Sequence, residues 1–130
     1  KDRGLRTGLI KHLAKENLEI DQPGKDTWRY RQAGAPTVVL SGRNQLAVFS
    51  DISEETPLEK LLLFFRDYDL VLLEGYFLKE IQKLEIYQPE MGEPLTCGME
   101  NVFAVDPGSS PELLAESIIK WVESGKAVNV

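Results

Sequence analysis

The stretch Asp69-Leu70-Val71-Leu72-Leu73-Glu74-Gly75 gives the clearest indication of the fold of this 130-residue chain. Its four consecutive aliphatic residues are typical of a strand that is buried on both faces within a parallel sheet. An acid and a glycine follow that strand directly. In sheets of this kind, ligands bind beyond the carboxyl ends of the strands. The stretch therefore predicts an α/β fold with a ligand site near Glu74 and Gly75.

Strands and helices alternate along the rest of the chain. We expect strands at 5–10, 37–41, 45–50, 83–87 and 102–105, a short extended piece at 18–21, and helices at 25–33, 57–66 and from 110 onward. Gly42-Arg43-Asn44 separates two β-rich runs, which is the signature of a β-hairpin. The alternation predicts a mainly parallel sheet that carries one hairpin.

Composition and charge limit the function. The length predicts a single domain over residues 1–130, and no apolar run is long enough to span a membrane. The net charge of −6 argues against a nucleic-acid partner. A single cysteine, Cys97, excludes an internal disulfide and fits a reducing compartment such as the cytoplasm. One histidine without a Cys/His cluster argues against structural zinc.

Polar residues follow three of the predicted strands at the same edge of the sheet. They are Lys11-His12, Glu74-Gly75 and Asp106. In phosphate-binding enzymes an acid at the position of Glu74 holds Mg²⁺, and a glycine such as Gly75 lets the backbone approach the ligand. The alternative is that Glu74 caps a neighbouring helix or pairs with a lysine. His12 is a candidate ligand contact, although a lone histidine is more often structural.

A second concentration of polar residues lies in the stretch 20–35. Pro23-Gly24 predicts a turn into a helix, with Lys25 and Arg29 spaced i, i+4 on one helix face, where they could share an anion. Asp21 is a candidate metal ligand, and Asp26 an acid at the helix start. The alternative is a solvated surface face, with ordinary turn chemistry at Asp21.

Four stretches together resemble the molybdopterin-guanine dinucleotide biosynthesis adapter protein (MobB) family. They are Leu5 to His12, Ile20 to Ala35, Asp69 to Gly75, and Lys83-Leu84-Glu85-Ile86. The resemblance runs in order from about Gly4 to Asp106. Its most specific parts are Pro-Gly-Lys-Asp at 23–26 and Leu-Glu-Gly at 73–75.

The resemblance implies a P-loop NTPase-like, three-layer α/β/α fold that binds GTP with Mg²⁺. It implies a cytoplasmic homodimer that assists the molybdenum cofactor guanylyltransferase in attaching GMP to molybdopterin, with at most weak GTPase activity. By motif match, Glu74 is the Mg²⁺-side acid. Nucleotide or anion contacts are expected from His12, Asp21, Lys25, Asp26, Arg29 and Gly75.

The sequence departs from the family pattern at two places. Phe77 stands where the family commonly has a lysine, and Lys79 is the nearest cation. The glycines also show no Walker-A spacing, so the first strand and the P-loop are expected to be missing from these residues. That strand is expected beside 69–73. An upstream segment, a partner's strand or a rearranged sheet could replace it, and we favour the upstream segment.

Two other functions remain open. The first is a nucleotide-free interaction module that kept the partner surface and lost the phosphate cradle, with the hairpin at 37–50 as a pairing edge for a second copy. The second is a P-loop kinase or metallochaperone GTPase relative. It would need a substrate insert or a Cys/His delivery site, and the sequence shows neither.

Overall fold

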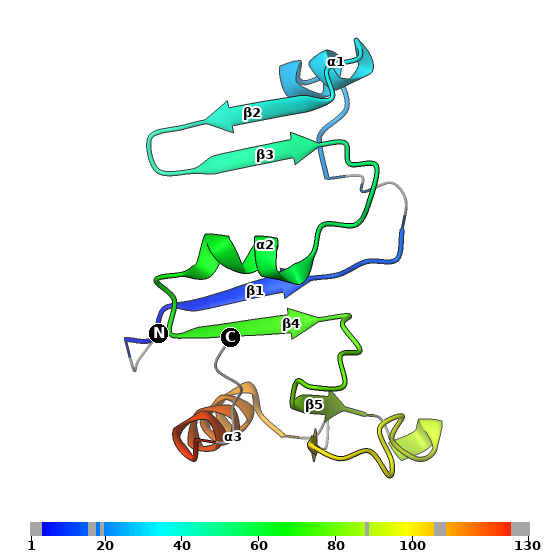
Figure 1. Ribbon diagram of the computed structural model, residues 1–130, viewed down its shortest axis with the longest axis vertical. Coiled ribbons are helices and arrows are strands. Elements are labelled where there is room, and N and C mark those ends of the chain that lie inside the picture. Colours follow the sequence, from blue (N-terminus) through cyan, green and yellow to red (C-terminus); the bar gives the residue numbers. More distant parts are fainter. Residues whose placement is uncertain (1–3, 16–17, 19, 88, 106–108, 126–130) are drawn as a thin grey trace. The chain divides into compact units, whose positions relative to one another are not determined.

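The computed structural model describes residues 4–15, 18, 20–87, 89–105 and 109–125 (Figure 1). The chain divides into two compact units, residues 1–76 and 77–130, which are described separately below. The single domain over residues 1–130 stays a prediction. Asp106 lies outside the described residues, so its expected place at the edge of the sheet also stays a prediction.

The first unit contains the stretch that predicted the fold. Its elements are β1 (Thr7–Lys11), α1 (Asp26–Gln32), β2 (Thr37–Ser41), β3 (Leu46–Ser50), α2 (Leu58–Leu62), the 3-10 helix η1 (Leu63–Phe65) and β4 (Leu70–Glu74). Strands β1 and β4 are parallel and lie side by side, in a register that puts Lys11 opposite Glu74 (Figure 1). The carboxyl ends of the two strands therefore meet at one edge.

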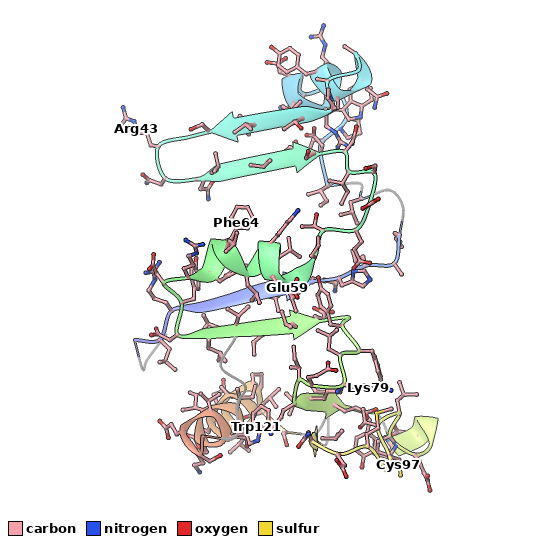
Figure 2. The ribbon with its side chains drawn as sticks, in the orientation of Figure 1. Arg43, Glu59, Phe64, Lys79, Cys97 and Trp121 are labelled. Carbon is pink, nitrogen blue, oxygen red and sulfur yellow. The ribbon has the colours of Figure 1, made fainter. Side chains whose placement is uncertain are left out.

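A small apolar centre forms on one face of β1. Ile10 is 8% exposed, and Gly8 is buried beneath the ring of Phe65. A Cβ on Gly8 would collide with that ring, so glycine is what allows η1 to pack closely on the strand. Phe64, by contrast, is 75% exposed, and Figure 2 shows its ring projecting from the helix. The core of this unit thus lies between β1 and η1.

The predicted hairpin is confirmed. Strands β2 and β3 are antiparallel, and the Gly42 N–H donates to the Gln45 carbonyl at 2.9 Å across the turn that carries Arg43 (Figure 2). Helix α1 is anchored near this ladder, because Arg31 Nη2 donates to Asp51 Oδ1 at 3.2 Å. This contact fixes the end of the helix that follows the Pro-Gly turn.

The second unit contains β5 (Lys83–Ile86), the 3-10 helix η2 (Pro89–Met91), β6 (Val102–Val105) and α3 (Pro111–Glu123). Strands β5 and β6 form a second parallel pair. The predicted last helix begins as expected, with Pro111 as its first residue and the Ser110 side chain accepting a hydrogen bond from the Leu113 N–H at 3.3 Å.

The structure confirms an α/β fold with parallel strand pairs and a hairpin, and it corrects several details. Strand β1 extends to Lys11, which the sequence placed after the strand. Helix α1 begins at Asp26, so Lys25 precedes it. Leu72 is 37% exposed, so β4 is not buried on both faces within the first unit. Leu18 and Ile20 belong to no strand.

No helix in the described ranges is long and apolar enough to cross a membrane.

Candidate ligand site at the ends of β1 and β4

The parallel register brings a lysine onto the predicted metal-binding acid. Lys11 Nζ donates to Glu74 Oε1 at 2.7 Å, and the two side chains are 51% and 55% exposed. Glu74 is therefore an exposed, paired carboxylate, where the sequence had suggested one at the end of a fully buried strand. The alternatives to a metal role for Glu74 were a helix cap and a lysine pair, and the structure shows the lysine pair.

The backbone beneath this pair is held tightly. The His12 N–H donates to the Glu74 carbonyl at 2.8 Å, which extends the ladder by one residue beyond β1. Gly75 has a φ of +82°, and a Cβ there would collide with the His12 carbonyl oxygen. Glycine is needed here for both its conformation and its size. The predicted close approach of the backbone at Gly75 is thus made to His12.

Two residues that sequence reasoning missed also contact His12. The ring of Tyr76 lies 5.2 Å from the His12 ring, centroid to centroid. Glu55 Oε1, from the loop before α2, lies 3.4 Å from His12 Nδ1. Tyr76 directly follows the Glu-Gly pair and could have been included on that ground. Glu55 lies in no motif, and only the folded chain brings it to His12.

The Pro-Gly segment forms a separate, rigid turn. Gly24 has a φ of +85°, and the Lys25 N–H donates to the Gln22 carbonyl at 3.2 Å. Asp21 Oδ1 accepts hydrogen bonds from the Gln22 N–H and from Thr27 Oγ1, each at 2.9 Å. Asp21 therefore clamps the turn to the first residues of α1.

An open hollow of about 380 Å³ lies beside this turn. Its lining is Ile20, Asp21, Gln22, Lys25, Asp26, Thr27 and Leu40. Asp21 Oδ2 is buried and has no hydrogen-bond partner among the described residues, although Oδ1 has two. The hollow combines a cationic side chain, two carboxylates and apolar walls.

The predicted site residues fall into two groups. His12, Glu74 and Gly75 meet at the β1–β4 edge, whereas Asp21, Lys25 and Asp26 line the hollow. Arg29 is not among the lining residues. Lys25 precedes α1 with extended backbone, φ −77° and ψ 161°, although its carbonyl accepts a hydrogen bond from the Arg29 N–H at 2.9 Å. The shared helix face of Lys25 and Arg29 stays a prediction. No hydrogen bond or ion pair joins the two groups within the described part of the chain.

The donor set decides whether a metal ion fits. The described residues contain no group of three or more His, Cys, Asp or Glu side chains that could hold one. Mg²⁺, however, commonly takes only one or two carboxylates together with phosphate oxygens and waters. The exposed Glu74 carboxylate is a ligand of the type that such a partial site needs.

The paired parallel strands and the hairpin define an α/β protein, and its structural match indicates a P-loop-like fold. A crystal structure of molybdopterin-guanine biosynthesis protein B (mobB) has this fold. It matches with a TM-score of 0.57 and 25% identity over 92% of this chain and 82% of its own chain.

The chain belongs to the MobB family, whose sequence profile, Molybdopterin guanine dinucleotide synthesis protein B, matches residues 1–106. A molybdopterin-guanine dinucleotide biosynthesis adapter protein from Haemophilus influenzae is 34% identical over 79% of this chain and 58% of its own length. The protein of the same name from Escherichia coli K12 is 33% identical over 69% of this chain and 53% of its own length. The chain thus spans about half the length of these curated relatives.

Proposed function

We propose that this protein is a GTP-binding adapter in the biosynthesis of molybdopterin guanine dinucleotide. It assists the guanylyltransferase that attaches GMP to molybdopterin, as a cytoplasmic homodimer with at most slow GTP hydrolysis of its own. The observation that carries the proposal is the family match over residues 1–106, and the names of the two relatives support it.

The β1–β4 edge is the metal and phosphate end of the proposed site. Glu74 takes the Mg²⁺ side, and His12 and Gly75 lie beside it on the same strand ends. The Mg²⁺ ion, when bound, neutralises phosphate charge. Exposed ion pairs are worth only about 0–1 kcal/mol, so the Lys11–Glu74 pair offers little resistance to an incoming ligand.

The Asp21–Thr27 turn supplies further anion contacts in this proposal. Its two hydrogen bonds to Asp21 Oδ1 hold Lys25 and Asp26 at the rim of the hollow. A pre-formed turn loses little conformational freedom when a ligand binds, which favours affinity. Arg29 contributes from the next turn of α1.

The proposal is tested with the full-length protein. Equilibrium binding of a fluorescent GTP analogue is measured with Mg²⁺ and with EDTA, and Glu74→Gln is compared with the wild type. We expect saturable binding that Mg²⁺ strengthens and that Glu74→Gln weakens only when Mg²⁺ is present. In a reconstituted reaction, adding the protein should increase molybdopterin guanine dinucleotide formation by the guanylyltransferase. Absence of binding and of stimulation together would overturn the proposal.

One observation favours the second candidate, a nucleotide-free interaction module. Val39, Leu46 and Val48 are 57%, 66% and 54% exposed, and the hairpin register puts them on the same face of β2–β3. Such a face suits a second copy of the chain. If the protein forms a dimer and stimulates the guanylyltransferase without binding GTP, this module replaces the first proposal.

A further inference from the structure

We propose that Lys11 is a phosphate-binding residue, held on Glu74 in the free protein and transferred to a phosphoryl oxygen when the ligand binds. The inference rests on the proposed function, because it takes a phosphorylated ligand at the β1–β4 edge as given. It adds Lys11 to the expected nucleotide or anion contacts, which had included His12 but not its neighbour.

The position of Lys11 suits this role. Along β1, exposed and buried residues alternate, and Lys11 lies on the open face, on the side opposite Gly8 and Ile10. The strand ends at Lys11, so its side chain starts at the edge where ligands of parallel sheets bind. A lysine ammonium has three N–H donors, and Glu74 Oε1 takes one at 2.7 Å. The remaining donors can reach a second anion.

The surroundings of the pair allow the side chain to move while the backbone stays fixed. The bond from the His12 N–H to the Glu74 carbonyl and the close approach of Gly75 to His12 hold the two strand ends together. Both side chains of the pair are about half exposed, and within the described residues neither side chain makes another hydrogen bond. The side-chain contact can therefore break without disturbing the ladder.

The charges balance in both states. In the free protein the Lys11 ammonium neutralises the Glu74 carboxylate. With a divalent cation bound, Glu74 would be one of its ligands, and the Lys11 ammonium would be free to pair with a phosphate oxygen. Both side chains are about half exposed, so breaking their ion pair costs little.

The experiment measures binding of GTP and of inorganic pyrophosphate to the full-length protein by calorimetry. Lys11→Met should weaken both affinities about ten-fold, the size of one charge-assisted hydrogen bond, and Lys11→Arg should recover part of the loss. Lys60→Met is the matched control, because it removes the same charge from an exposed position of α2. Lys60→Met should bind like the wild type.

A second measurement separates Lys11 from a merely structural role. In EDTA, Glu74→Gln should bind pyrophosphate more tightly than the wild type, because Lys11 is no longer held by a carboxylate. Equal or weaker binding in EDTA, or equal affinities for Lys11→Met and Lys60→Met, would overturn the inference. If the wild type binds pyrophosphate but not GTP, the nucleotide proposal fails. The comparison of Lys11→Met with Lys60→Met then still tests the role of Lys11. If it binds neither, both proposals fall.

Discussion

Two glutamates, one in each parallel strand pair, differ in how they are held. Glu85 in β5 accepts hydrogen bonds from the N–H groups of Leu95 and Thr96, at 2.8 and 2.9 Å, and from the Thr96 hydroxyl. The Thr96 side-chain hydrogen bond, followed by the two backbone bonds, lowers the pKa of Glu85 although partial burial opposes this. Among the described residues, Glu74 at the end of β4 has one side-chain partner, the exposed ammonium of Lys11.

The difference separates a structural carboxylate from one that is ready for a ligand. Backbone N–H groups cannot leave Glu85 without unfolding the loop, and Thr96 is only 7% exposed. A lysine side chain can leave Glu74 by rotating its own bonds, at the cost of a weak exposed ion pair. The same residue type thus serves loop packing in one unit and, in our proposal, ligand exchange in the other.

The largest expected effect comes from the backbone under Glu74. Gly75→Ala must place a Cβ at positive φ and against the His12 carbonyl oxygen. We expect a loss of about 2–4 kcal/mol in the free energy of unfolding, from left-handed strain and overpacking together. Urea denaturation measures it. Gly24→Ala is the control, because φ there is +85° and no atom of the described residues lies within 4 Å of the added Cβ. An equal loss for both variants would contradict the role of the His12 contact.

The next effect should be confined to the second unit. Glu85→Gln keeps one acceptor oxygen but loses the charge that favours the hydrogen bonds from Leu95 and Thr96. We expect hydrogen exchange of these two amides to accelerate several-fold, whereas the His12 amide is unaffected. Exposed Glu93→Gln in the same loop region is the control. Unchanged exchange at Thr96 would mean that the carboxylate does not hold the loop.

The pH dependence follows from the lowered pKa of Glu85. A carboxyl whose folded pKa lies below its ordinary value of 4.5 stabilises the fold fully above that value. The contribution is lost as the pH falls through the lowered folded pKa. Protection of the Thr96 amide should therefore decrease in acid below the ordinary carboxyl range, and Glu85→Gln should not show this step. A step at higher pH, above 4.5, would contradict the assignment.

The sequence predicted structure formed by residues close together in the chain, and it did not predict contacts between residues far apart in the chain. Three local patterns were predicted: the strand at 69–73, which the structure shows as Leu70–Glu74, the hairpin and the Pro-Gly turn. The Lys11–Glu74 pair joins residues 63 positions apart, so it depends on the strand register, which no local pattern supplies. The Glu85–Thr96 bonds depend in the same way on a loop conformation.

The predicted burial of β4 failed for a different reason. An aliphatic run such as Leu70–Leu73 indicates a strand covered on both faces and both edges. In the first unit, β1 pairs with one edge of β4, and Leu72 remains exposed. The aliphatic run therefore indicates more burial of β4 than the described residues of the first unit provide.

The smallest expected effect is the stability change on removing the exposed pair. Glu74→Gln should alter the free energy of unfolding by less than about 1 kcal/mol, because exposed ion pairs contribute little. Its thermal midpoint should match that of Lys11→Met. A large loss of stability would show that the pair holds the fold together, and would place Glu74 in the same structural class as Glu85.

The most direct test of the central claim is a two-dimensional ¹H–¹⁵N spectrum of the full-length protein, titrated with GTP and Mg²⁺. The account predicts that the amide shifts of Lys11, His12, Glu74 and Gly75 change with ligand concentration, whereas those of Leu95 and Thr96 stay constant. Shifts confined to the Glu85-bound loop, with the β1–β4 edge unchanged, would contradict it.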